Sequence, residues 1–267
     1  MSDDVASLID RDEAAAALRT YTSRLCTILR DSPDPDERAI GIWTVGEVAN
    51  HIASGIENYS QWMQDRDAPD LDELRNMSAW NVETVRALAR ADLPQLADRI
   101  EVATDAFVEA AAARSASSEV RWYAGNRIPV GVAVCMRLIE AAVHGRDVAV
   151  AGKRQWQIER DDARMMAYGL GYIGPYFVHD DALDFEGTVR VRVRGGADLY
   201  YVVRDQRLRV ATDGPRPHWH LSVDPVAWVL VTTERRNQWS AAIRGQIFGW
   251  GTRPDLPFKL RAATFQG

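Results

Sequence analysis

The chain has 267 residues, of which 46% are hydrophobic and 26% charged, a composition typical of a globular protein with about two domains. Its formal net charge of −6 argues against a nucleic-acid-binding surface. Two cysteines without a CxxC spacing indicate buried thiols in a reducing compartment rather than a disulfide framework. The N-terminus is acidic, and no apolar run approaches the ~18 residues of a membrane span, so we expect a cytoplasmic protein.

The first half of the chain follows a helical hydrophobic period. Apolar side chains recur at helical spacing over residues 7–29. The segment Thr44-Val-Gly-Glu47 is a capping-box pattern, which predicts the start of a second helix. A mostly helical region is expected over residues 71–113, restarting at Pro94, and a further helix over residues 130–150. About four antiparallel helices predict a four-helix bundle, in which side chains from facing helices can form a metal site.

In the second half of the chain the hydrophobic period changes to two, after one more helix expected over residues 159–176. Residues 188–194 alternate apolar and basic side chains, as a half-buried strand does. We predict further strands, a short helix capped by Asp224 and a helical tail toward Phe265; the strands are expected at 199–203, 208–210, 219–223 and 240–245. This pattern predicts a separate α+β domain. We place the helical domain at residues 1–152 and the α+β domain at residues 153–267.

Three polar residues follow a helical spacing inside the predicted helix 130–150. Glu140, His144 and Asp147 are four and then three residues apart, so they share one stripe of the helix. Glu140 and His144 can bind one divalent ion together, but two ligands hold a metal poorly. His51, at the edge of the buried stripe of the second helix, is the best candidate for a third ligand. Three protein ligands with one open position are typical of a catalytic metal site. A Glu/His pair four residues apart on a helix, however, is usually a solvated face.

Two other motifs are weaker. His218 and His220 share one face of a predicted strand, but no acidic residue is near them in sequence, so we predict surface or packing roles. The glycine-rich segment from Gly245 to Gly251 does not join a strand to a helix as a dinucleotide-binding loop does.

The segments Trp43-Thr-Val-Gly-Glu-Val-Ala-Asn-His51 and Arg137-x-x-Glu140-x-x-x-His144-x-x-Asp147 resemble motifs of the mycothiol-dependent maleylpyruvate isomerase family, within the wider DinB-like metalloenzyme group. The second segment matches the R-x-x-E-x-x-x-H-x-x-D helix of that family at every fixed position. The stretch Asp224-Pro225-Val-Ala-Trp-Val-Leu and residues 245–254 resemble the family's sterol-carrier-protein-like domain. The resemblance implies a DinB-like four-helix bundle followed by an α+β sterol-carrier-protein-like domain. It also implies one divalent metal ion, usually zinc, on His51, Glu140 and His144.

The resemblance further implies that mycothiol, a low-molecular-weight thiol of actinobacteria, is a cosubstrate. A metal with an open position can bind the sulfur, remove its proton and hold the thiolate beside a small electrophilic substrate, for isomerisation or S-transfer. Asp147 would then orient a ligand or its water. Arg137, on the polar side of its helix, would pair with a substrate carboxylate or, as readily, form a salt bridge with Glu140 or Asp147. The expected partners are small molecules, without nucleic acid or membrane, and the expected assembly is a monomer or a small homo-oligomer.

Two other classes of function stay open. In a metal-dependent hydrolase, metal-bound water rather than a thiolate attacks the substrate. In a non-catalytic protein, the C-terminal domain holds an apolar ligand while the metal only stiffens the bundle. Activity that depends on added thiol distinguishes the first function from the hydrolase. A metal without an open coordination position would indicate the binding protein.

Overall fold

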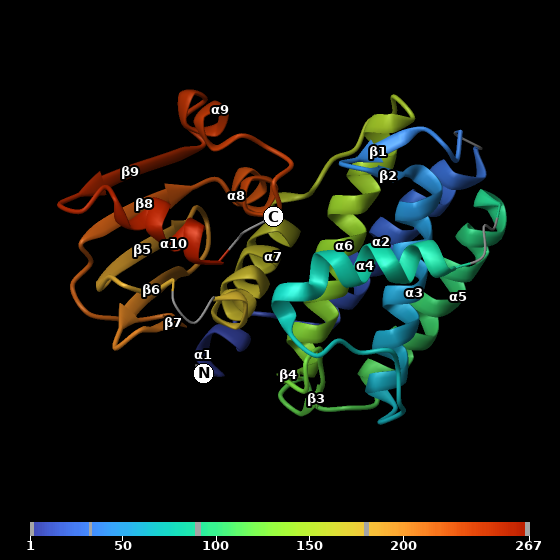
Figure 1. The fold of residues 1–267 in the computed structure, drawn as a ribbon, viewed down its shortest axis with the longest axis horizontal. Helices are drawn as coiled ribbons and strands as arrows, with labels where there is room; N and C mark the ends of the chain where they lie inside the picture. Colours follow the sequence, from blue (N-terminus) through green and yellow to red (C-terminus); the bar gives the residue numbers. More distant parts are fainter. Residues whose placement is uncertain (1–2, 32–33, 89–91, 179–181, 265–267) are drawn as a thin grey trace. The chain divides into compact units, whose positions relative to one another are not determined.

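The computed structural model describes residues 3–31, 34–88, 92–178 and 182–264. Contacts between residues divide them into a helical unit, Asp10–Ile158, and an α+β unit made of the described residues of Met1–Ile9 and Glu159–Gly267 (Figure 1). A helical N-terminal domain and a later α+β region are therefore confirmed. The predicted boundary between residues 152 and 153 stays a prediction, as do the DinB-like bundle and the sterol-carrier-protein-like fold.

The described part of the helical unit is dominated by long helices that pack against one another, α2 with α5 and α6 and α3 with the same two. These helices are α2 (Arg11–Arg30), α3 (Val45–Met63), α5 (Leu93–Ala112) and α6 (Val130–Ala151). The shorter elements between them are strands β1 (Arg38–Ile40) and β2 (Trp43–Thr44), the 3-10 turn η1 (Leu74–Asn76), helix α4 (Met77–Ala87), and strands β3 (Glu119–Arg121) and β4 (Arg127–Pro129). None of the helices in the described residues is long and apolar enough to cross a membrane.

Side-chain caps determine where the helices begin. The Asp10 carboxylate accepts hydrogen bonds from the free N–H groups of the first turn, so α2 begins at Arg11 and not near residue 7, where the apolar period alone placed it. The predicted capping box is confirmed, because the Glu47 N–H donates to the Thr44 hydroxyl at 3.3 Å and the Thr44 N–H donates to the Glu47 carboxylate at 2.9 Å. Asp92 caps α5, which confirms the predicted restart of the helix near Pro94.

An aromatic cluster fills the core of the helical unit. The rings of Tyr59, Trp62, Phe107 and Trp122 are almost completely buried. The Tyr59 ring centroid lies 5.2 Å from that of Trp62 and 6.2 Å from that of Phe107. The Trp122 Nε1–H donates to the Tyr59 hydroxyl at 2.6 Å, which satisfies two polar atoms inside an apolar core. This packing fixes α3 against α5 and thereby fixes His51, which lies about two turns before Tyr59 on α3.

The α+β unit contains a five-stranded sheet in its described residues, with strand order β7-β6-β5-β8-β9 (Figure 1). Strands β5 and β8 pair in parallel and the other neighbours pair antiparallel. The strands are β5 (Gly187–Val193), β6 (Asp198–Arg204), β7 (Arg207–Ala211), β8 (Trp219–Val223) and β9 (Ile247–Gly251). The helices and the 3-10 turn are α1 (Asp3–Ala6), α7 (Arg160–Ile173), η2 (Gly174–Phe177), α8 (Pro225–Thr232), α9 (Gln238–Ile243) and α10 (Leu256–Thr264).

Most of the predicted elements of this unit are present, and the cap of α8 by Asp224 is confirmed. The strand predicted at residues 240–245 is wrong, because most of this segment belongs to helix α9. The Asn237 side chain accepts hydrogen bonds from the N–H groups of Trp239 and Ser240 and so starts a helix. The last strand is instead β9, inside the glycine-rich segment. The predicted helical tail is α10, although Phe265 lies outside the described residues.

Residues 10–158 expressed alone are expected to form a soluble helical protein with one cooperative thermal transition. Their helices pack mainly on one another, and the aromatic core lies wholly within this segment. Far-ultraviolet circular dichroism and thermal unfolding would measure this, with the full chain as reference. A product without cooperative unfolding would show that the helical unit is not an independent domain.

Candidate metal centre

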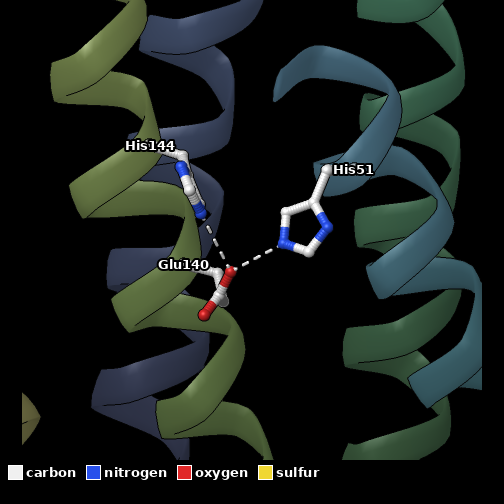
Figure 2. A group of neighbouring side chains, drawn as sticks. All are labelled: His51, Glu140 and His144. Atoms are coloured by element: carbon white, nitrogen blue, oxygen red, sulfur yellow. Dashed lines mark hydrogen bonds and ion pairs between the residues drawn. The ribbon is translucent and has the colours of Figure 1, made fainter. Parts of the chain in front are cut away.

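Three polar side chains from two helices converge in the helical unit (Figure 2). His51 comes from α3, and Glu140 and His144 come from α6. The same Glu140 carboxylate oxygen, Oε2, lies 3.1 Å from Nε2 of His51 and 3.3 Å from Nε2 of His144. Their candidate ligand atoms all lie within 4.8 Å of one another. The structure therefore brings together the three predicted ligands, although 89 residues separate His51 from Glu140.

Close packing fixes the turn of α6 that carries His144. Gly145 faces the Trp156 ring, and a Cβ atom at this position would collide with the indole. The Trp156 Nε1–H donates to the carbonyl oxygen of Ala142 at 2.9 Å, which holds the ring against the helix. His144, the residue before Gly145, lies on the side of α6 that faces His51 on α3 (Figure 2).

Trp43 forms an aromatic wall beside the two histidines. Its ring lies parallel to the His144 ring, with centroids 6.3 Å apart and an angle of 7°, and meets the His51 ring edge-on at 4.9 Å. Sequence reasoning did not assign Trp43 to the site. The feature of the sequence that could have indicated this role is the position of Trp43 immediately before Thr44, the residue that caps the helix of His51.

Asp147 lies behind His144, as its spacing predicted. Its Oδ2 atom is 3.1 Å from Nδ1 of His144, and its side chain is 2% exposed. When Nδ1–H donates to this carboxylate, Nε2 of the neutral ring, which faces Glu140, is the nitrogen that can bind a metal. A carboxylate behind a histidine in this way is the usual device that fixes the ring orientation of a metal ligand.

Arg137 lies on the side of α6 that faces α3, as Glu140 does, but it is buried. The residue is 5% exposed, and its guanidinium carbon lies 4.0 Å from the centroid of the Tyr59 ring. Gly55 provides the space, since Nη1 would be 2.6 Å from a Cβ atom at that position. Burial lowers the pKa of Arg137, but the nearby Tyr59 and Glu140 outweigh burial and raise it overall, so the side chain carries its charge into the core. Its role toward a substrate stays a prediction.

The electrostatics of the site favour the ligand forms of two of the three side chains. Burial lowers the pKa of His51, against the opposing effect of Glu140, so the imidazole is neutral at pH 7. For Glu140, burial raises the pKa, but the hydrogen bonds with His144 and His51 hold it well below its usual value. A neutral imidazole and an ionised carboxylate are the states that coordinate a metal.

The residues present fit a divalent ion. Two imidazole nitrogens and one carboxylate oxygen form a donor set that zinc and other first-row metals accept. The side chains of His51, His144 and Glu140 are 14%, 13% and 26% exposed, so the centre is sheltered without being closed to small molecules. This combination is typical of a reactive centre more than of a structural one.

The two histidines of the α+β unit do not join this centre. His218 Nδ1 accepts a hydrogen bond from the backbone N–H of Thr188 at 3.1 Å. The His220 ring stacks on Trp250, with centroids 5.1 Å apart and an angle of 5°. Both contacts agree with the packing roles predicted for these residues.

Replacing Asp147 with asparagine is expected to weaken metal binding about tenfold without preventing it. Asparagine can still hydrogen-bond to Nδ1 of His144, but it no longer offers a negative charge that favours Nε2 as the ligand atom. Competition with a chromophoric chelator measures the affinity. An unchanged affinity would contradict an orienting role for Asp147, and Asp105→Asn, at an exposed position of α5, is the control.

A helical domain with a half-buried His/Glu/His centre defines a class of candidate metalloproteins. Within that class, the chain belongs to the mycothiol maleylpyruvate isomerase family, because the family model described as "Mycothiol maleylpyruvate isomerase N-terminal domain" matches residues 15–149. This segment is half of the chain and includes His51, Glu140 and His144. The family resemblance drawn from the sequence motifs is thereby confirmed.

Solved structures support the same fold. A crystal structure of the mycothiol-dependent maleylpyruvate isomerase shares 15% identity with this chain at a TM-score of 0.51. A histidine-to-alanine mutant, also titled mycothiol-dependent maleylpyruvate isomerase, shares 14% identity at a TM-score of 0.54. Both alignments cover 83% of this chain and 88% of the other. At this identity the likeness shows the fold alone. No curated protein matches the chain.

Proposed function

We propose that the protein is a divalent-metal enzyme that uses a low-molecular-weight thiol to isomerise a small electrophilic substrate. The convergence of His51, Glu140 and His144 within 4.8 Å carries the proposal. Membership of a family described by mycothiol and maleylpyruvate isomerase supports mycothiol as the thiol and isomerisation, rather than S-transfer, as the reaction. We further propose that the metal is zinc. The helical unit would be a DinB-like four-helix bundle, and the α+β unit would be a sterol-carrier-protein-like domain.

His51, Glu140 and His144 would hold the ion. A bound divalent cation lowers the pKa of a thiol and so supplies a thiolate at neutral pH. Asp147 keeps the His144 ring in one orientation by accepting from Nδ1–H. Trp43 lies against both imidazoles and excludes water from that side. These residues maintain the geometry of the centre, while the thiol and the substrate provide the reacting atoms.

Isomerisation uses the thiol without consuming it. When a thiolate adds to a double bond conjugated with a carbonyl group, a carbon–sulfur bond forms and the π electrons move toward the carbonyl oxygen. The former double bond can then rotate. Loss of the thiolate breaks the carbon–sulfur bond and restores a double bond of the opposite geometry.

Cobalt substitution tests the thiol directly. We expect mycothiol to give the strong near-ultraviolet absorption of a thiolate–cobalt bond, with release of a proton, because the ligand is the deprotonated sulfur. S-methylated mycothiol is the matched control, because it keeps the body of the molecule but has no ionisable thiol. The absence of any change with mycothiol would overturn the thiol proposal while leaving the metal centre intact. Hydrolysis of an ester or amide without thiol would then identify a hydrolase.

A further inference from the structure

The five-stranded sheet of the α+β unit ends in two edge strands, β7 and β9. Edge strands expose backbone N–H and C=O groups that can pair with another chain, and most of them are protected against this. Strand β7 carries Arg207 and Arg209, and helix α1 contacts it. The Asp4 carboxylate of α1 accepts hydrogen bonds from the N–H and the hydroxyl group of Thr212, next to the end of β7, both at 2.7 Å. The β7 edge is therefore protected by its charges.

Strand β9 lacks such charges. Its sequence, Ile247-Phe-Gly-Trp-Gly251, contains no charged residue and no proline. At one end of its ladder with β8, the Asp224 N–H donates to the Gln246 carbonyl at 2.7 Å. At the other end, the Thr252 N–H donates to the His218 carbonyl at 2.9 Å. Alternate residues of an antiparallel ladder bond to the same neighbour. The even-numbered residues of β9 therefore bond to β8, and the N–H and C=O groups of its odd-numbered residues point away from the sheet.

These outward backbone groups have no other partner within the described part of the chain. Exposed apolar side chains gather around them. The described residues include eight large hydrophobic side chains that are exposed, and five of them belong to β9, α9 or α10: Phe248, Trp250, Trp239, Ile243 and Phe258. Helix α9 contacts β9 (Figure 1), and the Trp239 and Phe258 rings stack with centroids 5.8 Å apart. Apolar groups gathered in this way on a surface are typical of an interface.

We propose that the partner at this edge is a second copy of the chain, and that the two β9 strands pair antiparallel across a twofold axis at Gly249. In this register each Phe248 lies opposite the partner's Trp250. The Phe248 and Trp250 rings of one chain already stack, with centroids 5.7 Å apart and an angle of 28°. Pairing joins the two stacks into one aromatic cluster, and the outward N–H and C=O groups of each edge satisfy those of the other. A strand that is complementary to itself forms the closed, symmetric contact of a homodimer.

Charge and area both favour a copy of the same edge. Strand β9 has no acidic side chain to balance the arginines of β7, so the two different edges do not match, whereas β9 matches itself. The five exposed side chains are 44% to 88% exposed. At ~200 Å² for a fully exposed aromatic side chain, they present roughly 500 Å² of apolar surface. With the backbone of the strand this approaches the ~800 Å² that each partner buries in a standard interface. The dimer is therefore weak and depends on protein concentration.

Pairs of cysteines in the full-length protein test the register. In the proposed dimer, residue 248 lies directly opposite residue 250 of the other copy, with Cα atoms ~4.5 Å apart, within the reach of a disulfide. Two copies of residue 248 are diagonal neighbours, ~8 Å apart, which is beyond that reach. Under mild oxidation, a mixture of Phe248→Cys and Trp250→Cys should therefore form a mixed disulfide dimer, and each variant alone should not. Cys26 and Cys135 are completely buried and do not compete.

Self-association without cross-linking provides a second test. Analytical ultracentrifugation of the full-length protein should show a reversible dimer at high micromolar concentration. Phe248→Lys should weaken it about tenfold or more, because two ammonium groups would enter the aromatic cluster. Val102→Lys is the matched control, since Val102 is a 71% exposed apolar residue of the helical unit, and it should leave the dimer unchanged. In hydrogen exchange, the N–H of Gly249 should become protected as the protein concentration rises, and this protection should be lost in Phe248→Lys.

The proposal fails if the protein stays monomeric at every concentration and the cysteine mixture gives no mixed dimer. It also fails if a dimer persists unchanged in Phe248→Lys, because the interface then lies elsewhere. Binding of the monomer to phosphatidylcholine vesicles, lost in Phe248→Lys, would assign the β9 edge to a membrane surface instead. Chelation of metal should leave the dimer unchanged, because β9 and the candidate metal centre belong to different units. This proposal and the metal-dependent function can therefore fail separately.

Discussion

Replacing Glu140 with glutamine is expected to remove the divalent ion from the protein. Glutamine has nearly the same shape, so the variant tests charge more than packing. The Glu140 carboxylate is the one anionic group among the three candidate ligands, and one of its oxygens lies within 3.3 Å of both imidazoles. We expect the affinity for zinc to fall by about 100-fold or more, since even outer partners of metal ligands contribute tenfold to a hundredfold. Elemental analysis and chelator competition measure the loss.

Glu47→Gln is the matched control for this substitution. Glu47 is also a carboxylate near His51, one turn earlier on α3, but its side chain is used in the capping box with Thr44. We expect it to retain the metal and to lose a small part of the cap energy, about 1 kcal/mol. His218→Ala and His220→Ala should also retain the metal. Full metal content in Glu140→Gln would refute the proposed centre.

Replacing Phe107 with alanine is expected to lower the free energy of unfolding of the helical unit by about 3–5 kcal/mol. Phe107 is completely buried and meets the Tyr59 ring edge-on, so its removal leaves a cavity beside the aromatic cluster. Because this loss is a large fraction of the stability of a typical domain, the variant should also show a markedly lower unfolding temperature.

Val102→Ala on the same helix is the control, since Val102 is 71% exposed. Its effect should stay within about 0.5 kcal/mol. Urea unfolding, followed by the helical signal of residues 10–158, gives both values. Equal stability of the two variants would show that the aromatic cluster is not the core that positions α3.

The sequence was sufficient for the candidate ligands because their geometry is largely local. Glu140 and His144 lie one helical turn apart, and the helix that carries them is well predicted by its apolar period. The place of His51 at the edge of its stripe required only the correct start of α3, which the capping box supplied. Hydrophobic periodicity does not predict which helix faces meet. The resemblance to the family motifs was what indicated that His51 lies close to Glu140 and His144.

The errors arose where tertiary contacts override local pattern. The helical spacing predicted the side of α6 on which Arg137 lies, but it could not predict that Gly55 and the Tyr59 ring hold this side chain inside the core. The segment of α9 resembles a strand in sequence because a short apolar segment has no decisive period, whereas the Asn237 cap starts a helix there. Trp43 was not assigned to the site because stacking between separate segments leaves no mark on spacing.

The cysteines described by the structure also affect how the chemistry of this protein can be followed. Cys26 and Cys135 are both fully buried, and burial, together with the charge of Glu101, raises the pKa of Cys26 to about 12. A thiol of this kind is almost entirely protonated at neutral pH and reacts slowly with alkylating reagents. Reagents that report free thiols in the folded protein will therefore count added low-molecular-weight thiols and not the polypeptide. In the proposed reaction, the redox state of the surrounding thiol pool, more than oxidation of the protein itself, would then set how much thiol is available.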